Sequence, residues 1–202
     1  MKKYVFEGKT EEEVILNSLK ELEVKEDEMI YSIEEETTGL LKKKKYIMNI
    51  ILKSDVLEYS KQYIKEITNG MGFDVNIETK RNENYLKLIL HSENNSLLIG
   101  KNGRTLQSIQ ILLRQSILNK TGIFANIILD VENYKEKREK SIERLAKKIA
   151  KEVEQTKIEV KMDSMNSYER RIVHNILSNN KKVTTISEGE EPNRYVIVKP
   201  ID

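Results

Sequence analysis

Two glycines three residues apart interrupt what otherwise looks like one continuous helical pattern. Gly100 and Gly103 stand in the stretch LLIGKNGRTL, residues 97–106. An apolar run stops before them, and apolar residues resume at helical spacing after them, at Leu106, Ile109, Leu113 and Ile117. Glycine has no Cβ and adopts left-handed backbone conformations readily, so the pair predicts a sharp turn between two helices. The fold has to accommodate this turn.

The glycine spacing excludes two common nucleotide-binding loops. A P-loop needs a glycine, four further residues and then Gly-Lys-Ser/Thr. Here Asn102 follows Lys101, and no glycine stands five residues before Gly100. A Rossmann fingerprint needs a different glycine spacing directly after a strand of a parallel sheet. Two interpretations remain, a plain corner between helices and a clamp for a nucleic-acid backbone.

Charge is balanced over the chain but uneven around the glycines. The 202 residues carry a formal net charge of +2. No acidic residue occurs between Asn94 and Leu129, whereas four basic residues do: Lys101, Arg104, Arg114 and Lys120. A basic stretch without acids is typical of a local anion site.

Apolar periodicity predicts three small modules, residues 1–53, 54–132 and 133–202, and an α+β fold class. The first has the order strand, helix, strand, strand. The second has helix, strand, strand, short helix, Gly-x-x-Gly, helix, strand. The third begins with a long helix and continues with short strands around one further helix. Strands are expected at 3–7, 29–33, 46–52, 73–79, 85–91, 124–131, 158–162, 183–187 and 194–198, and the longer helices after Thr10 and at 54–69, 104–118, 134–156 and 167–178.

Several positions within these elements receive specific assignments. Thr10 is expected to cap the first helix, and Ser54 the second. Leu16 and Leu145 are assigned to the interior faces of their helices. The lysine run 42–45, within the loop TTGLLKKKK, is expected to be a solvated loop.

Composition excludes several classes of protein. There is no cysteine, and therefore neither a disulfide framework nor a thiolate metal site. No run of about 18 apolar residues is present to span a bilayer, and the beginning MKKYVFEGKTEEEV lacks the apolar centre of a signal peptide. No cluster of His, Asp and Glu has ligand or catalytic spacing. We expect a cytoplasmic, non-catalytic protein that needs no cofactor and no metal.

Two helices that meet at Gly-x-x-Gly on a three-stranded sheet resemble the KH RNA-binding domain, in its type II order. In that domain the loop clamps about four nucleotides. Lys101 would contact a phosphate, Asn102 would add a hydrogen bond, and Leu98 with Ile99 would form an apolar floor opposite strand 124–131. The residues assigned to this RNA contact are Ile99, Gly100, Lys101, Asn102, Gly103, Arg104 and Arg114.

The stretch NSYERRIVHNIL places Arg170 and His174 on one helix face, because they are four residues apart. It resembles the R-three-H domain, a single-stranded nucleic-acid binder named for this spacing, as does the following SEGEEPNRYVIV. The resemblance implies an anion-facing patch of Arg170 and His174, with Arg171 and Arg194 as additions and the acidic turn 188–191 orienting them. The alternative is a surface pair in which His174 bonds a local acid.

Together the modules resemble the bacterial Jag family, also called KhpB or EloR. The resemblance implies an RNA chaperone or post-transcriptional regulator that binds single-stranded RNA at both sites. It further implies a small KH-only protein partner, or a homodimer, and a role in cell elongation and envelope (peptidoglycan) synthesis. Association with a membrane-protein insertase in the family implies work near the membrane through partners. The alternative function is a non-catalytic interaction scaffold that uses the KH fold for dimerisation.

Overall fold

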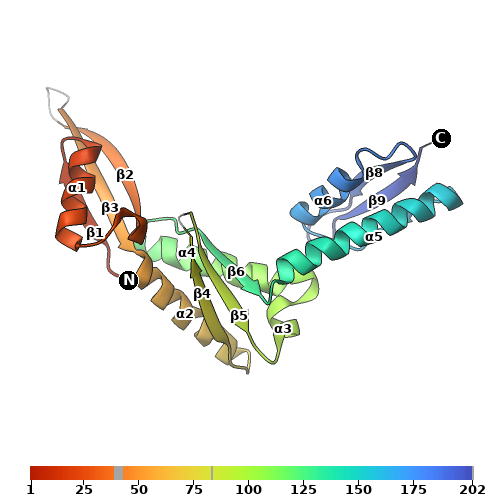
Figure 1. Cartoon of the computed structure of the whole chain (residues 1–202), viewed down its shortest axis with the longest axis horizontal. Coiled ribbons are helices and arrows are strands. Elements are labelled where there is room, and N and C mark those ends of the chain that lie inside the picture. Colours follow the sequence, from red (N-terminus) through yellow and green to blue (C-terminus); the bar gives the residue numbers. More distant parts are fainter. Residues whose placement is uncertain (39–42, 83, 202) are drawn as a thin grey trace. The chain divides into compact units, whose positions relative to one another are not determined.

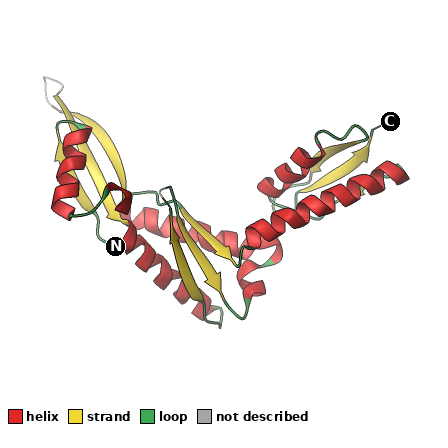
Figure 2. Ribbon diagram, in the orientation of Figure 1, coloured by secondary structure: helices red, strands yellow, loops and turns green. Residues whose placement is uncertain are grey.

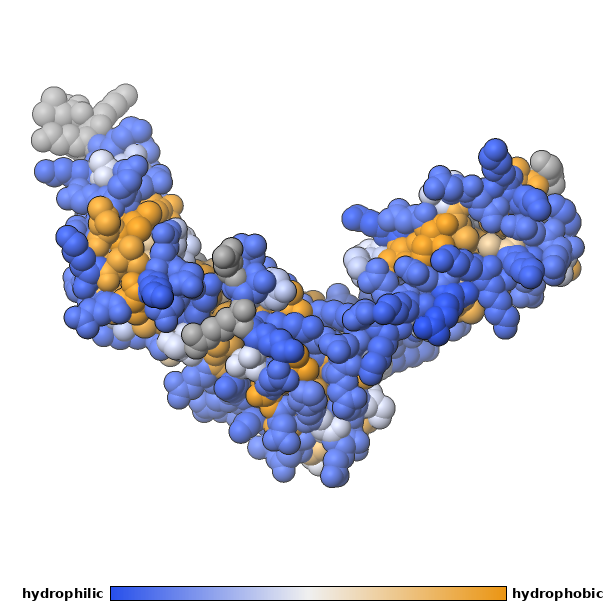
Figure 3. Space-filling model, viewed as in Figure 1, coloured by the Kyte–Doolittle hydropathy of each residue, from blue (hydrophilic) through white to orange (hydrophobic). Residues whose placement is uncertain are grey.

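This computed structural model describes residues 1–38, 43–82 and 84–201 (Figure 1). These residues form three sheets of three strands each, accompanied by helices (Figure 2). The chain separates into two compact units, residues 1–132 and 133–202. The predicted α+β class is confirmed. In Figure 3 hydrophilic side chains cover most of the visible face, with apolar patches between them.

The first sheet has the strand order β1-β3-β2, and all its pairs are antiparallel. One helix, α1, packs on it through Val14, against Met29, Met48 and Ile50. Thr10 caps this helix as predicted, because its hydroxyl accepts a 3.1 Å hydrogen bond from the Glu13 amide. The elements are β1 (Tyr4–Gly8), α1 (Glu11–Leu22), β2 (Met29–Thr38) and β3 (Lys43–Leu52), with a 3-10 turn at Glu26–Glu28.

Two assignments in this part are wrong. Leu16 is 57% exposed, because the helix buries Val14 and Ser18, and Leu16 lies two residues, or about 200°, around from each. Lys44 and Lys45 lie in β3 and not in a loop, where they pair with Glu35 at 2.9 Å and with Glu7 at 2.8 Å. Carboxylates on the neighbouring strands make a lysine-rich strand acceptable. Of the other residues in the predicted loop, Thr37 and Thr38 lie in β2 and Lys43 in β3, and residues 39–42 lie outside the described residues.

The second sheet has the order β4-β5-β6, in which β4 pairs antiparallel and β6 parallel to β5. The predicted order of helix, strand, strand, helix, helix, strand is confirmed. The long helix α2 begins at Lys53, directly after β3 and without a side-chain cap, so the prediction that Ser54 caps it is wrong. The elements are α2 (Lys53–Gly70), β4 (Asn76–Arg81), β5 (Leu86–His91), α3 (Asn95–Ile99), a 3-10 turn (Lys101–Gly103), α4 (Arg104–Thr121) and β6 (Ile127–Val131).

The inner face of α4 covers this sheet. Its four predicted interior positions, Leu106, Ile109, Leu113 and Ile117, are all buried. The sheet contributes fully or nearly fully buried Leu86, Leu88, Ile127 and Leu129. Helical periodicity therefore identified the side of α4 that faces the core.

The third sheet has the order β7-β9-β8, with both pairs antiparallel. Its core joins Ala146 and Val153 with Val173 and Val198. Leu145 is 43% exposed, so its interior assignment is wrong: the small Ala146 takes the inward position next to it. The elements are α5 (Tyr134–Thr156), β7 (Val160–Lys161), α6 (Ser167–Leu177), β8 (Val183–Glu188) and β9 (Tyr195–Pro200).

Adjacent leucines on α4 test this packing. Leu113 is fully buried, so Leu113→Ala leaves a cavity and should lower the free energy of unfolding by about 2–5 kcal/mol. Leu112 is 53% exposed, and Leu112→Ala should change it by less than about 0.5 kcal/mol. Urea titration followed by the NMR amide signals of β4–β6 measures both. Equal losses for the two variants would contradict the assigned face.

Candidate nucleic-acid interface

The glycine turn between α3 and α4 is built from left-handed residues. Gly100 has φ +68°, Asn102 has φ +55° and Gly103 has φ +76°. Apart from glycine, asparagine is among the few residues that enter this region readily, because its short polar side chain can hydrogen-bond locally. The sequence Gly-Lys-Asn-Gly thus supplies suitable residues at all three left-handed positions.

Gly100 is required by the turn itself. A Cβ placed there would lie 2.1 Å from Oγ1 of Thr105 and 3.1 Å from the Thr105 amide nitrogen. The Gly100 amide also donates a 2.8 Å hydrogen bond to the carbonyl of Ser96. The first turn of α4 therefore packs directly on this glycine. Internal packing alone explains Gly100, whether or not a ligand approaches it.

The side chains around the turn differ in exposure. Lys101 is exposed, and Ile99, Asn102 and Arg104 are half-buried. Leu98 is fully buried, so the prediction that it forms the floor of an open groove is wrong. Leu97, 53% exposed, presents the apolar surface instead. The sequence could not show which of Leu97 and Leu98 is exposed, because three consecutive apolar residues carry no periodicity.

Arg114 lies ten residues along α4 from Arg104, or about 15 Å from the turn. Its Nε donates to the carbonyl of Ile127 at 2.8 Å, and its terminal nitrogen donates to Asn126 Oδ1 at 3.2 Å. Burial lowers the pKa of this guanidinium from its usual value. The structure thus places Arg114 against the beginning of β6 and not beside the loop.

The nearest carboxylate after the acid-free stretch is neutralised. Asp130 is only 3% exposed, and Lys87 Nζ lies 2.9 Å from its Oδ2. On the same strand the Leu129 amide donates to Gln110 Oε1 at 2.9 Å, so α4 side chains occupy the outer edge of β6. The predicted open wall along 124–131 is therefore partly covered, while the charge around the turn stays basic.

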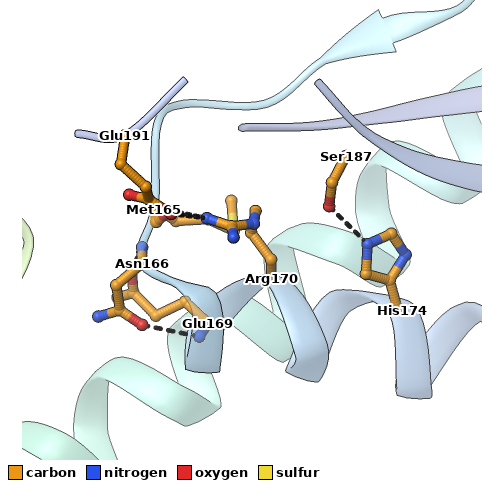
Figure 4. Close-up of polar contacts among 7 residues, drawn as sticks. All are labelled: Met165, Asn166, Glu169, Arg170, His174, Ser187 and Glu191. Atoms are coloured by element: carbon orange, nitrogen blue, oxygen red, sulfur yellow. Dashed lines mark hydrogen bonds and ion pairs between the residues drawn. The ribbon is translucent and has the colours of Figure 1, made fainter. Parts of the chain in front are cut away.

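In the second unit Arg170 is an interior residue. It is 7% exposed and donates from Nη1 to the Met165 carbonyl at 3.1 Å and to Glu191 Oε1 at 2.7 Å (Figure 4). Glu191 belongs to the acidic turn that follows β8, and its side chain is 57% exposed. The structure thus places the acidic turn directly against this arginine.

His174 is held by two hydroxyl groups on β8. Its Nε2 lies 2.8 Å from Ser187 Oγ (Figure 4). Its Nδ1 lies 2.6 Å from Thr185 Oγ1, so both ring nitrogens are engaged. Burial, with a smaller contribution from the nearby Arg170 charge, lowers the pKa of His174 below its usual 6.5. The ring is therefore neutral at pH 7. The alternative in which His174 bonds a local acid does not match these contacts.

A buried carboxylate that was not predicted from the sequence fixes the beginning of α6. Glu169, 4% exposed, accepts from the Asn166 amide at 3.1 Å, while the Asn166 side chain accepts from the Glu169 amide at 3.0 Å. Arg138 on α5 donates from Nε to Glu169 at 2.8 Å. The spacing Asn-x-x-Glu is a helix-capping signal, and it could have predicted the contact between Asn166 and Glu169. No sequence pattern near Glu169 predicts its contact with Arg138.

The other two predicted arginines lie closer to the surface. Arg171 is exposed on α6, and Arg194 is half-buried before β9. The Nε of Arg194 is buried and has no hydrogen-bond partner among the described residues. The structure therefore gathers Arg170 and His174 on the inner side of α6 and leaves Arg171 outside.

Residues 1–38, 43–82 and 84–201 offer neither a metal site nor a membrane span. Their His, Asp and Glu side chains form no cluster that could hold a metal ion. None of the helices among them is long and apolar enough to cross a membrane.

Comparison with known proteins gives consistent matches. The family model KhpA/KhpB, KH domain matches residues 58–130, and the R-three-H domain model matches residues 140–200. The RNA-binding protein KhpB of Clostridium symbiosum is 35% identical over 196 residues, 95% of this chain and 88% of the relative. KhpB of Bacillus subtilis is 29% identical over 197 residues, 95% of each chain. KhpB of Lactiplantibacillus plantarum is 35% identical over 136 residues, 67% of this chain and 42% of the relative.

The position of His174 makes the stability of the second unit depend on pH. Its folded pKa lies below the unfolded value near 6.5, so the unfolded state binds the proton more readily. Stability should be full above about pH 6.5, fall as the pH is lowered, and level off below the folded pKa. Urea titrations at about pH 7.5 to 5.5, followed by NMR signals of residues 133–202, measure this decline.

His174→Gln should flatten that decline, because the titrating group is gone. The matched control is His91→Gln, which removes the chain's other histidine, 44% exposed in the first unit. A decline of equal slope in the parent protein and in His174→Gln would show that His174 is not its cause.

Proposed function

The chain belongs to the KhpB family, whose members carry KH and R-three-H domains, and on this premise we propose that it binds single-stranded RNA without altering it chemically. Its relatives are named RNA-binding proteins. The observation that supports the proposal most is the tight left-handed turn at Gly100–Gly103, which exposes Lys101 within a stretch of sequence that contains no acidic residue. We further propose that the chain is organised in three modules, 1–53, 54–132 and 133–202, the first two of which lie within one compact unit.

At the turn, RNA would be held through its phosphates. Lys101 supplies an exposed positive charge directly before α4, an 18-residue helix. The amides of the first turn of such a helix and its dipole favour an anion at the same place. Asn102, Gly103 and Arg104 lie around that point, and Ile99 with Leu97 offers apolar surface to a base. Contacts of this kind read the backbone, so this site should have little sequence preference.

In the second unit we propose a division of roles. Arg171 and Arg194 contact phosphate, because an arginine fork can grip an anion with two hydrogen bonds. Arg170 and His174, being bound to Glu191 and to two hydroxyls, position α6 and the acidic turn around that surface. Two modest sites on one chain strengthen each other when one RNA strand reaches both.

By family resemblance we propose that the chain is an RNA chaperone or post-transcriptional regulator in the cytoplasm. The same resemblance supports a KH-only protein partner and a role in the control of cell elongation and of envelope synthesis near the membrane.

A second candidate function is pairing through the KH-like fold, with the KH-only partner or a second copy. It is favoured by two adjacent exposed apolar residues on α4, Ile111 at 56% and Leu112 at 53%. If the chain were only such a scaffold, RNA affinity would be weak and independent of the glycine turn. RNA titrations of variants in the turn therefore separate the two candidates.

Replacing the centre of the turn tests the first site. Lys101→Asp with Asn102→Asp keeps a residue that tolerates the left-handed conformation at position 102, but it reverses the charge. RNA affinity should fall about tenfold or more, equivalent to about 1.4 kcal/mol. The slope of log Kd against log salt should decrease by about 0.7 for each phosphate that the protein no longer neutralises. Fluorescence anisotropy with labelled single-stranded RNA measures both.

The matched control is Lys61→Asp with Gln62→Asp, at exposed neighbours on α2. It changes the total charge equally and should leave affinity nearly unchanged. If the two double variants lose RNA affinity equally, the loss is an effect of net charge, and the turn does not have the role that we assign to it.

The second site is tested at an exposed side chain, because replacing the buried Arg170 would leave the Met165 carbonyl and Glu191 without their hydrogen bonds. Arg171→Glu should weaken binding of a long strand several-fold and lower its salt slope by about 0.7. The control is Lys151→Glu, an exposed residue on α5. If Arg171→Glu titrates like Lys151→Glu at every salt concentration, this face of α6 does not contact RNA.

A further inference from the structure

An open pocket of about 210 Å³ lies in the first unit, away from the glycine turn. Strand β2 and the beginning of α2 line one side, and the segments before β5 and β6 line the other. The lining residues are Met29, Ile30, Tyr31, Lys53, Asn84, Tyr85, Leu86, Phe124 and Asn126. Its volume is below the range of about 300–1,000 Å³ typical of drug-sized ligands, so it suits a single planar group better than a whole cofactor.

Phe124 distinguishes this pocket from ordinary surface. The chain has three phenylalanines and no tryptophan. Phe73 is 8% exposed, Phe6 is half-buried, and Phe124 is 59% exposed. Exposed aromatic rings next to polar groups are the means by which proteins hold unstacked RNA bases. The pocket combines this ring with two tyrosines and two asparagine amides.

The polar wall of the pocket is fixed in place. Arg114 donates to Asn126 Oδ1 at 3.2 Å, and Asn126 Nδ2 donates to the Asn84 carbonyl at 3.0 Å. Tyr31 donates its hydroxyl to Glu26 at 2.8 Å, which orients that ring and engages the carboxylate. A wall already held by hydrogen bonds loses little conformational freedom when a ligand enters.

Two cations beside the pocket favour a phosphate backbone. The Arg114 guanidinium lies 5.9 Å from the centre of the Phe124 ring, and Lys3 places its ammonium beside Gly122, just after α4. The lining residue Lys53 is buried, and the Glu26 and Glu11 carboxylates act on Tyr31, where they help to raise its pKa. An apolar peptide would gain nothing from Arg114 and Lys3, whereas both help to hold a strand whose base occupies the pocket next to Phe124.

From these observations we infer that the Phe124 pocket binds one unstacked base of the same RNA strand that crosses the glycine turn. The inference rests on the proposed RNA binding and adds a site to it. The two places are separated along α4: the Phe124 ring lies 5.9 Å from the guanidinium of Arg114, a residue about 15 Å from the turn, and the whole 18-residue helix spans about 27 Å. At about 3.4 Å per stacked nucleotide a separation of about 15–27 Å is about four to eight nucleotides, beyond the four clamped at the loop. A strand of about twelve nucleotides reaches both.

The experiment compares two adenylate RNAs, of about four and about twelve nucleotides, on the full chain. Phe124→Ala should lower the affinity for the longer RNA about 5-fold or more, the effect of losing one base–aromatic stack. Its affinity for the shorter RNA should be unchanged. Phe124→Leu, which keeps apolar bulk without a ring, should lose as much affinity for the longer RNA as Phe124→Ala. Leu16→Ala, at a residue 57% exposed in the same unit, is the matched control and should bind both RNAs like the parent.

A direct readout is the fluorescence of 2-aminopurine placed singly along the longer RNA. One position should be quenched by the parent protein and not by Phe124→Ala. Unchanged affinity and quenching in Phe124→Ala, with the turn variant still defective, would overturn the pocket and leave the proposed function standing. Full binding of the longer RNA by Phe124→Leu would also overturn it, since apolar bulk without a stacked ring would then be sufficient. Absence of any RNA binding by the parent would overturn both proposals.

Discussion

The parallel pairing of β5 with β6 is the constraint on which the first unit depends. Parallel neighbours cannot be joined by a tight turn, so the chain must cross back to the starting end of the sheet. It does so through α3 and α4, and the reversal between these helices needs residues with positive φ. Gly100, Asn102 and Gly103 provide them, and Thr105 packs against Gly100. Lys101 is exposed as a consequence, because the inner side of so tight a turn is already filled by protein.

The second unit differs from the first in that it buries charged side chains, Glu169 and Arg170, next to a small apolar core. Arg138 with Glu169, and Arg170 with Glu191, each join elements that are distant in sequence. One member of each pair is buried, Glu169 in the first and Arg170 in the second, so removing its partner leaves an uncompensated buried charge. The pairs therefore fix where α6 and the acidic turn lie. On the division of roles that we propose, the Arg-x-x-x-His spacing that marks this region in the sequence is a framework for the neighbouring Arg171.

Sequence periodicity predicted the fold well wherever one face of an element meets one core, as on α4. It failed where a small residue takes the inward position, since Ser18 and Ala146 displaced Leu16 and Leu145 from the interior. The glycine spacing predicted the turn. The exposure of the residues around it could not be predicted, because Leu97 and Leu98 are chemically identical. The contacts of Arg114 and Arg138 could not be predicted either. Their partners lie 13 and 31 residues away and are brought close by the packing of the fold.

Scarcity of aromatic residues decides how such a chain can hold RNA at all. The chain has no tryptophan, a single exposed phenylalanine and an exposed Tyr168 in the other unit, so we expect affinity to come from several modest contacts spaced along a strand. The glycine turn and Phe124 lie in one compact unit, flanking the same helix, and a strand that reaches both needs no rearrangement of the protein. Arg171 and Arg194 belong to the other unit, and in the proposed binding they would gain only from the effective concentration that the strand provides. We therefore expect a surface of this design to discriminate by the length of unpaired RNA far more than by its sequence.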